Sequence, residues 1–398
     1  MPTVQGTAQP RAGLQRLACQ TSLFIAAALG ACASPPAATV PALFLNDAAF
    51  AAASEPIDAA RVFALSDSMR RYAATELASS SRADPRRQLI LALQKHERLR
   101  LSYDAATTRD AAEAFEARAG NCLSLVIMTA AFARHLGLPV SFQSVLVDEQ
   151  YSRSGNLLLS AGHVNLVLGR LPAASWFGHR ADDELTVDFL PSEELRGQRT
   201  ERLQESSIIA MYMNNRAAEA LAVGRTDDSY WWAREALRQE PSFLGAANTL
   251  AVIYQRRNLP REAETALRHV LTRDPDHTAA LSNLVSLLRR ADRVAEADAM
   301  AARLSQLQPV PPFHFFELGR RAMGAGDYRT ARSHFASELK RQPHQDEVHF
   351  WAALAHWHLG DEASATRHLR LALENSLTRN RHELYAATLD RLRASRVE

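Results

Sequence analysis

The chain has 398 residues, of which 47% are hydrophobic and 23% charged, a composition typical of globular proteins and a length sufficient for two or three domains. It holds 46 Lys and Arg residues against 44 Asp and Glu residues, which gives a formal net charge of +2. This balance argues against nucleic acid as a main partner, because nucleic-acid-binding surfaces carry an excess of basic residues.

The first 32 residues have the pattern of a signal peptide. Two arginines precede an apolar run over residues 23–29, which is too short to span a bilayer. The run ends in Leu29-Gly30-Ala31-Cys32, which resembles the lipobox of bacterial lipoproteins. The cysteine of a lipobox is lipidated and becomes N-terminal after cleavage, so Cys32 is the predicted membrane anchor. The alternative is an ordinary secretory signal that is cleaved after Ala33.

A Pro- and Ala-rich tether follows at residues 33–45. Because Ala33 rather than Asp follows the cysteine, the resemblance to bacterial lipoproteins implies sorting to the outer membrane. The predicted location is therefore the bacterial cell envelope, with a lipid anchor in the outer membrane and the protein facing the periplasm.

Residues 46–200 combine helical and strand-like patterns. Apolar groups at three- and four-residue spacing predict helices within 59–72 and 87–94, and Thr107 or Thr108 with Asp110 can begin a helix over 111–117. A longer apolar helix begins at Cys122 and ends at Leu136, before the helix-breaking pair Gly137 and Pro139.

Three short strands are predicted after this helix, at residues 140–147, 163–168 and 185–189. The polar segment 148–161 between the first two is predicted to be a loop that forms a lip over the site. An apolar helix followed by three strands predicts an α+β domain, with helices on one side of an antiparallel sheet.

Cys122 is the candidate nucleophile. The other two cysteines, Cys19 and Cys32, lie in the targeting segment, whereas Cys122 begins the long apolar helix. A thiolate at a helix N-terminus is stabilised by the helix dipole and by unpaired backbone N–H groups. The backbone N–H of Cys122 is also the expected donor to an oxyanion. The alternative for any lone cysteine is an inert, buried side chain.

Two further residues give Cys122 a chemical context. His163 follows after 41 residues and Asp188 after another 25, each in a predicted strand. An imidazole can activate a thiol when one ring nitrogen faces the sulfur and a carboxylate holds the other. The competing histidines and aspartates lie at a helix end or in polar segments; they are His135, His179, Asp182 and Asp183.

Residues 99–191 resemble the transglutaminase-like superfamily, which has a papain-like fold. The resemblance is carried by Arg118-Ala-Gly-Asn-Cys122, by Gly162-His163-Val-Asn-Leu and by Val187-Asp188-Phe-Leu-Pro191. It implies that Cys122 attacks an amide or ester carbonyl, that His163 takes and returns the proton, and that Asp188 orients the imidazole.

The second half of the chain is periodic. Prolines recur at a spacing of 34 residues and alanines keep the same period; they are Pro241, Pro275, Pro309, Pro343, Ala263, Ala297, Ala331 and Ala365. This is the period of tetratricopeptide (TPR) repeats, in which two antiparallel helices form each unit. An all-α TPR solenoid is therefore predicted over 207–378, followed by a capping helix at 379–398. Arg216 departs from the pattern, because it stands where an apolar residue is usual.

These features together predict an envelope-anchored, transglutaminase-like thiol enzyme that performs acyl transfer or amide hydrolysis through Cys122, His163 and Asp188. Its TPR groove is expected to recruit a protein or peptide partner or substrate. The alternative is a catalytically inactive transglutaminase-like domain in a TPR interaction scaffold. Neither a metal nor a cofactor is expected, because the chain has no metal-ligand spacing and no glycine-rich phosphate loop.

Overall fold

The computed structural model describes residues 45–77, 84–94, 101–105, 107–154, 157–169, 184–189, 199–376 and 379–394. All of them belong to one compact unit, residues 39–398. The predicted signal peptide and its Cys32 lie outside the described residues, as do His179, Asp182 and Asp183. None of the helices within the described ranges is long and apolar enough to cross a membrane.

The central helix of the α+β part is α4 (Cys122–His135), and eleven of its residues are buried. It begins and ends where the sequence predicts. The helix α3 (Ala111–Ala117) is also confirmed, and Asp110 begins it with a capping box to Glu113. The other helical segments of this part are η2 (Asp47–Ala49), η3 (Ala59–Arg61), α1 (Asp67–Tyr72), η4 (Ala73–Leu77) and α2 (Pro85–Gln94).

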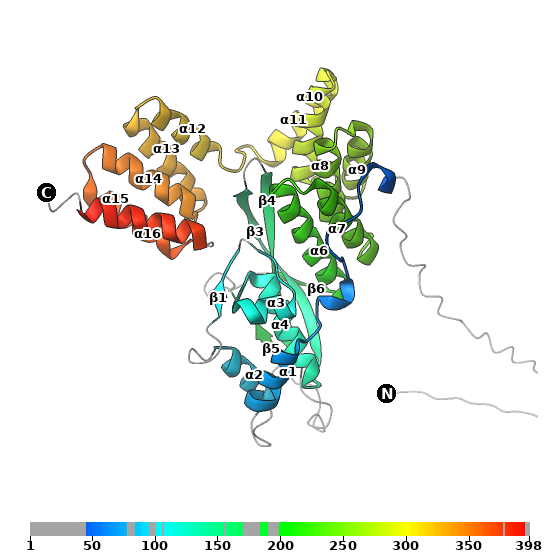
Figure 1. Ribbon diagram of the computed structural model, residues 1–398. Helices are drawn as coiled ribbons and strands as arrows, with labels where there is room; N and C mark the ends of the chain where they lie inside the picture. Colours follow the sequence, from blue (N-terminus) through cyan, green and yellow to red (C-terminus); the bar gives the residue numbers. More distant parts are fainter. Residues whose placement is uncertain are drawn as a thin grey trace, which may run out of the picture. The chain divides into compact units, whose positions relative to one another are not determined.

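A four-stranded antiparallel sheet packs against α4, with the strand order β5-β4-β3-β6. Its strands are β3 (Val140–Ser154), β4 (Leu157–Leu168), β5 (Leu185–Val187) and β6 (Arg199–Leu203). A second, two-stranded sheet pairs β1 (Ser102–Tyr103) with β2 (Ala119–Gly120) in parallel. Helix α4 lies in the middle of this part of the molecule and packs on β4 (Figure 1).

The prediction of a polar loop over residues 148–161 is wrong. Strands β3 and β4 instead form a long hairpin, paired from Gln150 with Ala161 to Ser154 with Leu157, beyond a register shift after Val145. The hairpin is visible as two long neighbouring arrows in Figure 1. Ladder hydrogen bonds join backbone groups, so a ribbon can continue through residues whose side chains show no apolar alternation.

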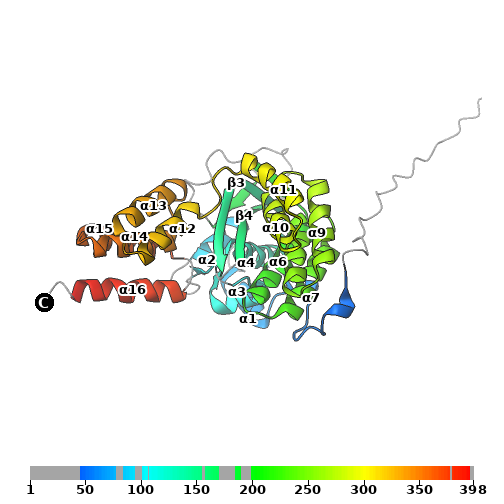
Figure 2. The ribbon, with the colours of Figure 1, turned by 90° about the horizontal axis from the view of Figure 1, so that it is seen from above.

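The repeat part consists of paired helices from α6 onward (Figure 2). The predicted periodicity is confirmed, because each of the four prolines comes two residues after a second helix ends and all four periodic alanines are fully buried. The helices are α6 (Glu205–Ala222), α7 (Thr226–Gln239), α8 (Leu244–Arg256), α9 (Pro260–Arg273), α10 (Thr278–Arg290), α11 (Val294–Leu307), α12 (His314–Gly324), α13 (Tyr328–Arg341), α14 (Asp346–His358), α15 (Glu362–Glu374) and α16 (Arg379–Ala394).

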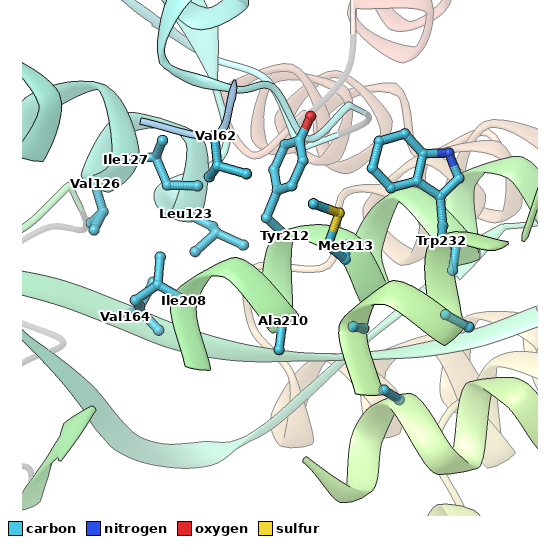
Figure 3. Packing of buried hydrophobic residues seen from close by; sticks show 14 of the residues in the cluster. Val62, Leu123, Val126, Ile127, Val164, Ile208, Ala210, Tyr212, Met213 and Trp232 are labelled. Atoms are coloured by element: carbon cyan, nitrogen blue, oxygen red, sulfur yellow. The ribbon is translucent and has the colours of Figure 1, made fainter. Parts of the chain in front are cut away.

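One apolar core extends from the α+β part into the repeats. Leu123 and Val126 of α4 belong to the same cluster as Ile208 and Met213 of α6 (Figure 3). Helices α12–α16 have smaller clusters of their own, one around Phe316 and Phe335 and one around Leu369 and Leu389. Helix α6, the first helix of the repeat part, therefore shares one apolar core with α4, which is called the thiol helix below because it begins at Cys122.

Residues 46–55, here called the strap, pack on the repeats although the sequence analysis grouped them with the α+β domain. Phe50 stacks on Tyr230 of α7 with ring centroids 4.0 Å apart. The backbone N–H and the hydroxyl of Ser54 both donate to the Asp228 carboxylate at 2.7 Å. Further strap hydrogen bonds join Asn46 to Tyr230 and Glu262, and Ala51 to Asp227 and Trp231.

Candidate thiol site

Cys122 is the first residue of α4 and is partly exposed. Asn121 caps the helix, because its Oδ1 accepts hydrogen bonds from the backbone N–H and the hydroxyl of Ser124, both at 2.9 Å. Gly120 is required just before the cap, since a Cβ there would lie 2.7 Å from the Cβ of Ser124. The Cys122 thiol thus lies at the positive end of a buried helix.

His163 and Asp188 are brought together by neighbouring strands. β4 carries His163, and its pairing with β5, Leu166 opposite Val187, places Asp188 directly after the strand end. The Nε2 atom of His163 lies 2.8 Å from Oδ1 and 2.9 Å from Oδ2 of Asp188. Because Nε2 is held by the carboxylate, Nδ1 is the ring nitrogen that remains for a thiol.

The pKa of His163 reports its contacts with both other residues of the predicted triad. Burial opposes the charged imidazolium, and His163 is only 5% exposed. Hydrogen bonding to Asp188 and then to the Cys122 side chain outweighs burial and raises the pKa to about 9. The structure therefore brings Cys122, His163 and Asp188 into one site.

Asn165 is a member of the site to which the sequence analysis gave no role. Its Nδ2 donates to Asp188 Oδ2 at 3.0 Å, and the residue is 4% exposed. Its Oδ1 is buried and has no hydrogen-bond partner among the described residues. The sequence could have indicated this role, because Asn165 lies two residues after His163 and therefore on the same face of the strand.

Tyr103 also reaches Cys122. The pairing of β1 with β2 sets Tyr103 opposite Gly120, two residues before the cysteine. Burial, then the charge of Cys122, raises the pKa of Tyr103 above its ordinary value. A hydrogen bond with the Cys122 backbone opposes this shift, and a weaker one with the Cys122 side chain adds to it. The residue as a whole stays 39% exposed. A two-residue strand gives no periodic signal, and this contact could not be predicted from the sequence.

The described alternatives lie elsewhere. His135 is the last residue of α4, at the end opposite to Cys122, and it is exposed. Within the described part of the chain, no group of three or more His, Cys, Asp or Glu side chains is arranged to hold a metal ion.

The tetratricopeptide repeat family matches residues 248–309 and 316–378, which extend from α8 to just beyond α15. These residues are TPR repeats. Repeats of this kind form a protein-interaction scaffold, in agreement with the predicted all-helical solenoid.

Similar proteins each match less than half of the chain. The TPR repeat-containing protein PA4667 of Pseudomonas aeruginosa is 28% identical over 215 residues, which cover 48% of this chain and 36% of the relative. The chain thus spans about a third of that relative. Among solved structures, pilF of Pseudomonas aeruginosa is 21% identical and covers 48% of this chain and 88% of its own, with a TM-score of 0.29. YrrB, a TPR protein with an unusual peptide-binding site, is 18% identical and covers 45% and 92%, with a TM-score of 0.25.

Proposed function

We propose that this protein is a transglutaminase-like thiol enzyme that transfers an acyl group from an amide or ester through a Cys122 thioester. The observation that supports this proposal is the His163 imidazole, which is held at Nε2 by Asp188 and interacts with the Cys122 side chain. The sequence resemblance over residues 99–191 supports the same assignment.

Each residue has a defined part in the proposed reaction. Because its pKa is raised to about 9, His163 already holds the thiol proton at neutral pH, and the Cys122 sulfur forms a bond to the substrate carbonyl carbon. The imidazolium then gives the proton to the leaving amine as the carbon–nitrogen bond breaks, which leaves a thioester. Water or a second amine attacks the thioester, returns a proton through His163 and restores the thiol. The backbone N–H of Cys122 stabilises the oxyanion, and Asp188 stabilises the imidazolium.

The repeats recruit the protein or peptide partner or substrate, and a lipid on Cys32 anchors the protein in the bacterial envelope, at the outer membrane and facing the periplasm. The alternative function, an inactive domain in an interaction scaffold, keeps the repeats and gives Cys122 no chemistry. It draws support from the family match, which covers only repeats.

Alkylation of Cys122 distinguishes the two functions. We expect iodoacetamide to modify Cys122 rapidly at and below neutral pH, and His163→Ala to slow this reaction about tenfold or more, because the base that takes the thiol proton is lost. The rate is measured against pH by mass spectrometry of the Cys122 peptide, with Cys122→Ala as the blank. Superimposable rate profiles for the wild type and His163→Ala would leave the inactive scaffold as the function.

The anchor has its own test. Cys32→Ser is expected to abolish labelling by a fatty-acid analogue in a bacterial host, because no other residue of the lipobox carries a thiol. Equal labelling of the wild type and of this variant would contradict lipidation at Cys32 and leave the secretory signal as the alternative.

A further inference from the structure

A chain of hydrogen bonds joins the first repeat helix to the residue that caps the thiol helix. Glu219 of α6 accepts a hydrogen bond at Oε1 from the backbone N–H of Thr108, at 2.6 Å. The hydroxyl of Thr108 in turn accepts one from Asn121 Nδ2, at 2.9 Å. Asn121 is the residue before Cys122, and its Oδ1 holds the N–H of Ser124. Three hydrogen bonds thus separate the repeat helix from the first turn of α4.

Thr108, in the middle of this series of hydrogen bonds, is buried, so water does not reach its hydrogen-bonding groups. Thr108 is 1% exposed, and the Glu219 side chain is 27% exposed. A buried N–H that loses its acceptor is costly, so removal of the Glu219 carboxylate destabilises the present position of the segment around Thr108. This segment is also fixed to α4 next to the cap, because the N–H of Arg109 donates to the hydroxyl of Ser124 at 2.8 Å.

The surrounding contacts hold α6 in one position against the site. Ile208 and Met213 of α6 share an apolar cluster with Leu123, the residue after the cysteine (Figure 3). Arg216 of α6 lies 3.6 Å from Glu113 of α3 and 3.6 Å from Glu55 of the strap. The residue that departs from the repeat pattern is therefore one that ties the first repeat to the α+β part.

We propose that Glu219 is a positioning residue for Cys122, and that the reactivity of the thiol depends on the place of α6 through the chain Glu219–Thr108–Asn121. The first repeat helix is then a component of the thiol site rather than only a part of the scaffold. This inference rests on the proposed thiol chemistry at Cys122.

The test compares substitutions at the two ends of the same helix. Glu219→Ala removes the acceptor and Glu219→Gln keeps an oxygen acceptor at the same place. Glu205→Ala is the matched control, because Glu205 also bonds α6 to α4, through Arg134, but at the end of α4 that is remote from Cys122. The full-length chain is used, and alkylation of Cys122 by iodoacetamide at pH 7 is followed on its own peptide, together with the melting temperature.

We expect Glu219→Ala to slow alkylation about fivefold or more, while Glu219→Gln and Glu205→Ala stay within about twofold of the wild type. Equal rates for Glu219→Ala and Glu205→Ala would overturn the inference. Equal slowing by Glu219→Ala and Glu219→Gln would also overturn it, since the acceptor would then not be the cause.

A second pair of variants examines the middle link, which also covers the case in which Glu219→Ala does not fold. Thr108→Val removes the hydroxyl that receives the Asn121 amide at nearly constant shape, and Thr108→Ser restores it. Slower alkylation of Cys122 in Thr108→Val, with a normal rate in Thr108→Ser, supports the link Glu219–Thr108–Asn121. Equal alkylation rates in the two variants contradict it. Failure of the proposed function looks different, because His163→Ala would then leave alkylation unchanged, whereas failure of this inference leaves the effect of His163→Ala intact.

Discussion

The first repeat and the later repeats follow one sequence period but are used differently. Helix α6 packs into the same core as α4 and is joined to the cap of α4 through Thr108, whereas the clusters of α12–α16 contain only residues of the later repeats. The family match begins at residue 248, in α8, so the part that departs from the repeat pattern is the part that contacts the α+β region. The comparison teaches that a repeat can be recruited into a neighbouring domain at the expense of its own pattern.

Truncation should give the largest difference between the two groups of repeats. A chain that stops before α6, at residue 204, loses Ile208 and Met213 from a shared core, and we expect it to be unfolded. A chain that stops at residue 309 keeps that core and should fold with normal alkylation of Cys122. Circular dichroism and the alkylation rate check both, and a folded 1–204 fragment would contradict the shared core.

Substitutions that create a single cavity should also distinguish the first repeat from the later repeats, with a smaller effect than truncation. Ile208 and Leu369 are both fully buried, and replacement of either by Ala should lower the free energy of unfolding by about 3 kcal/mol. Only Ile208→Ala should also slow alkylation of Cys122, because only Ile208 shares a cluster with the thiol helix. Denaturant unfolding gives the stabilities, and slowing by Leu369→Ala would show that the two groups are not independent.

The smallest expected differences concern His163 and His368, whose contributions to the free energy of unfolding change with pH in opposite directions. The pKa of His163 is raised to about 9, against burial, by Asp188 and Cys122, so its stabilising contribution is complete below pH 6.5 and is lost as pH rises through 9. The stability difference between the wild type and Asp188→Asn should therefore shrink by about 2 kcal/mol between pH 6.5 and 9.5.

His368 of α15 behaves in the other way. Its burial, followed by the charges of His349 and His356, lowers its pKa to about 4. The unfolded chain then binds a proton that the folded chain refuses, so stability falls as pH drops from 6.5 toward 4. His368→Gln should remove about 1 kcal/mol of this loss in denaturant titrations. A pH dependence identical in the wild type and in this variant would assign the loss to other groups.

The features that the sequence predicted are those that repeat or that lie on regular elements. The four periodic alanines are fully buried because each occupies the same position in its repeat unit. Cys122 and His163 could be predicted because the first begins an apolar helix and the second lies in an alternating strand. Apolar residues recur with the period of a helix or a strand because one face of the element is buried, and this recurrence can be read from the sequence.

The features that the sequence did not predict depend on contacts between distant segments. Tyr103 reaches Cys122 through a two-residue strand, and Glu219 meets Thr108 across 111 residues. Arg216 looked like a defect in a repeat, because its partners Glu55 and Glu113 belong to other parts of the chain. Such polar pairs follow no period, so only the folded chain identifies them.

The strap also determines how the molecule responds to mechanical load. A pulling force applied at residue 45 meets Asn46, Phe50 and Ser54 in turn; α7 holds all three, and α9 also holds Asn46. The load therefore enters the repeats before it reaches α1 and the thiol helix. A stacked aromatic pair and the carboxylate of Asp228 form the clamp, so tension on the N-terminal side is borne first by α7.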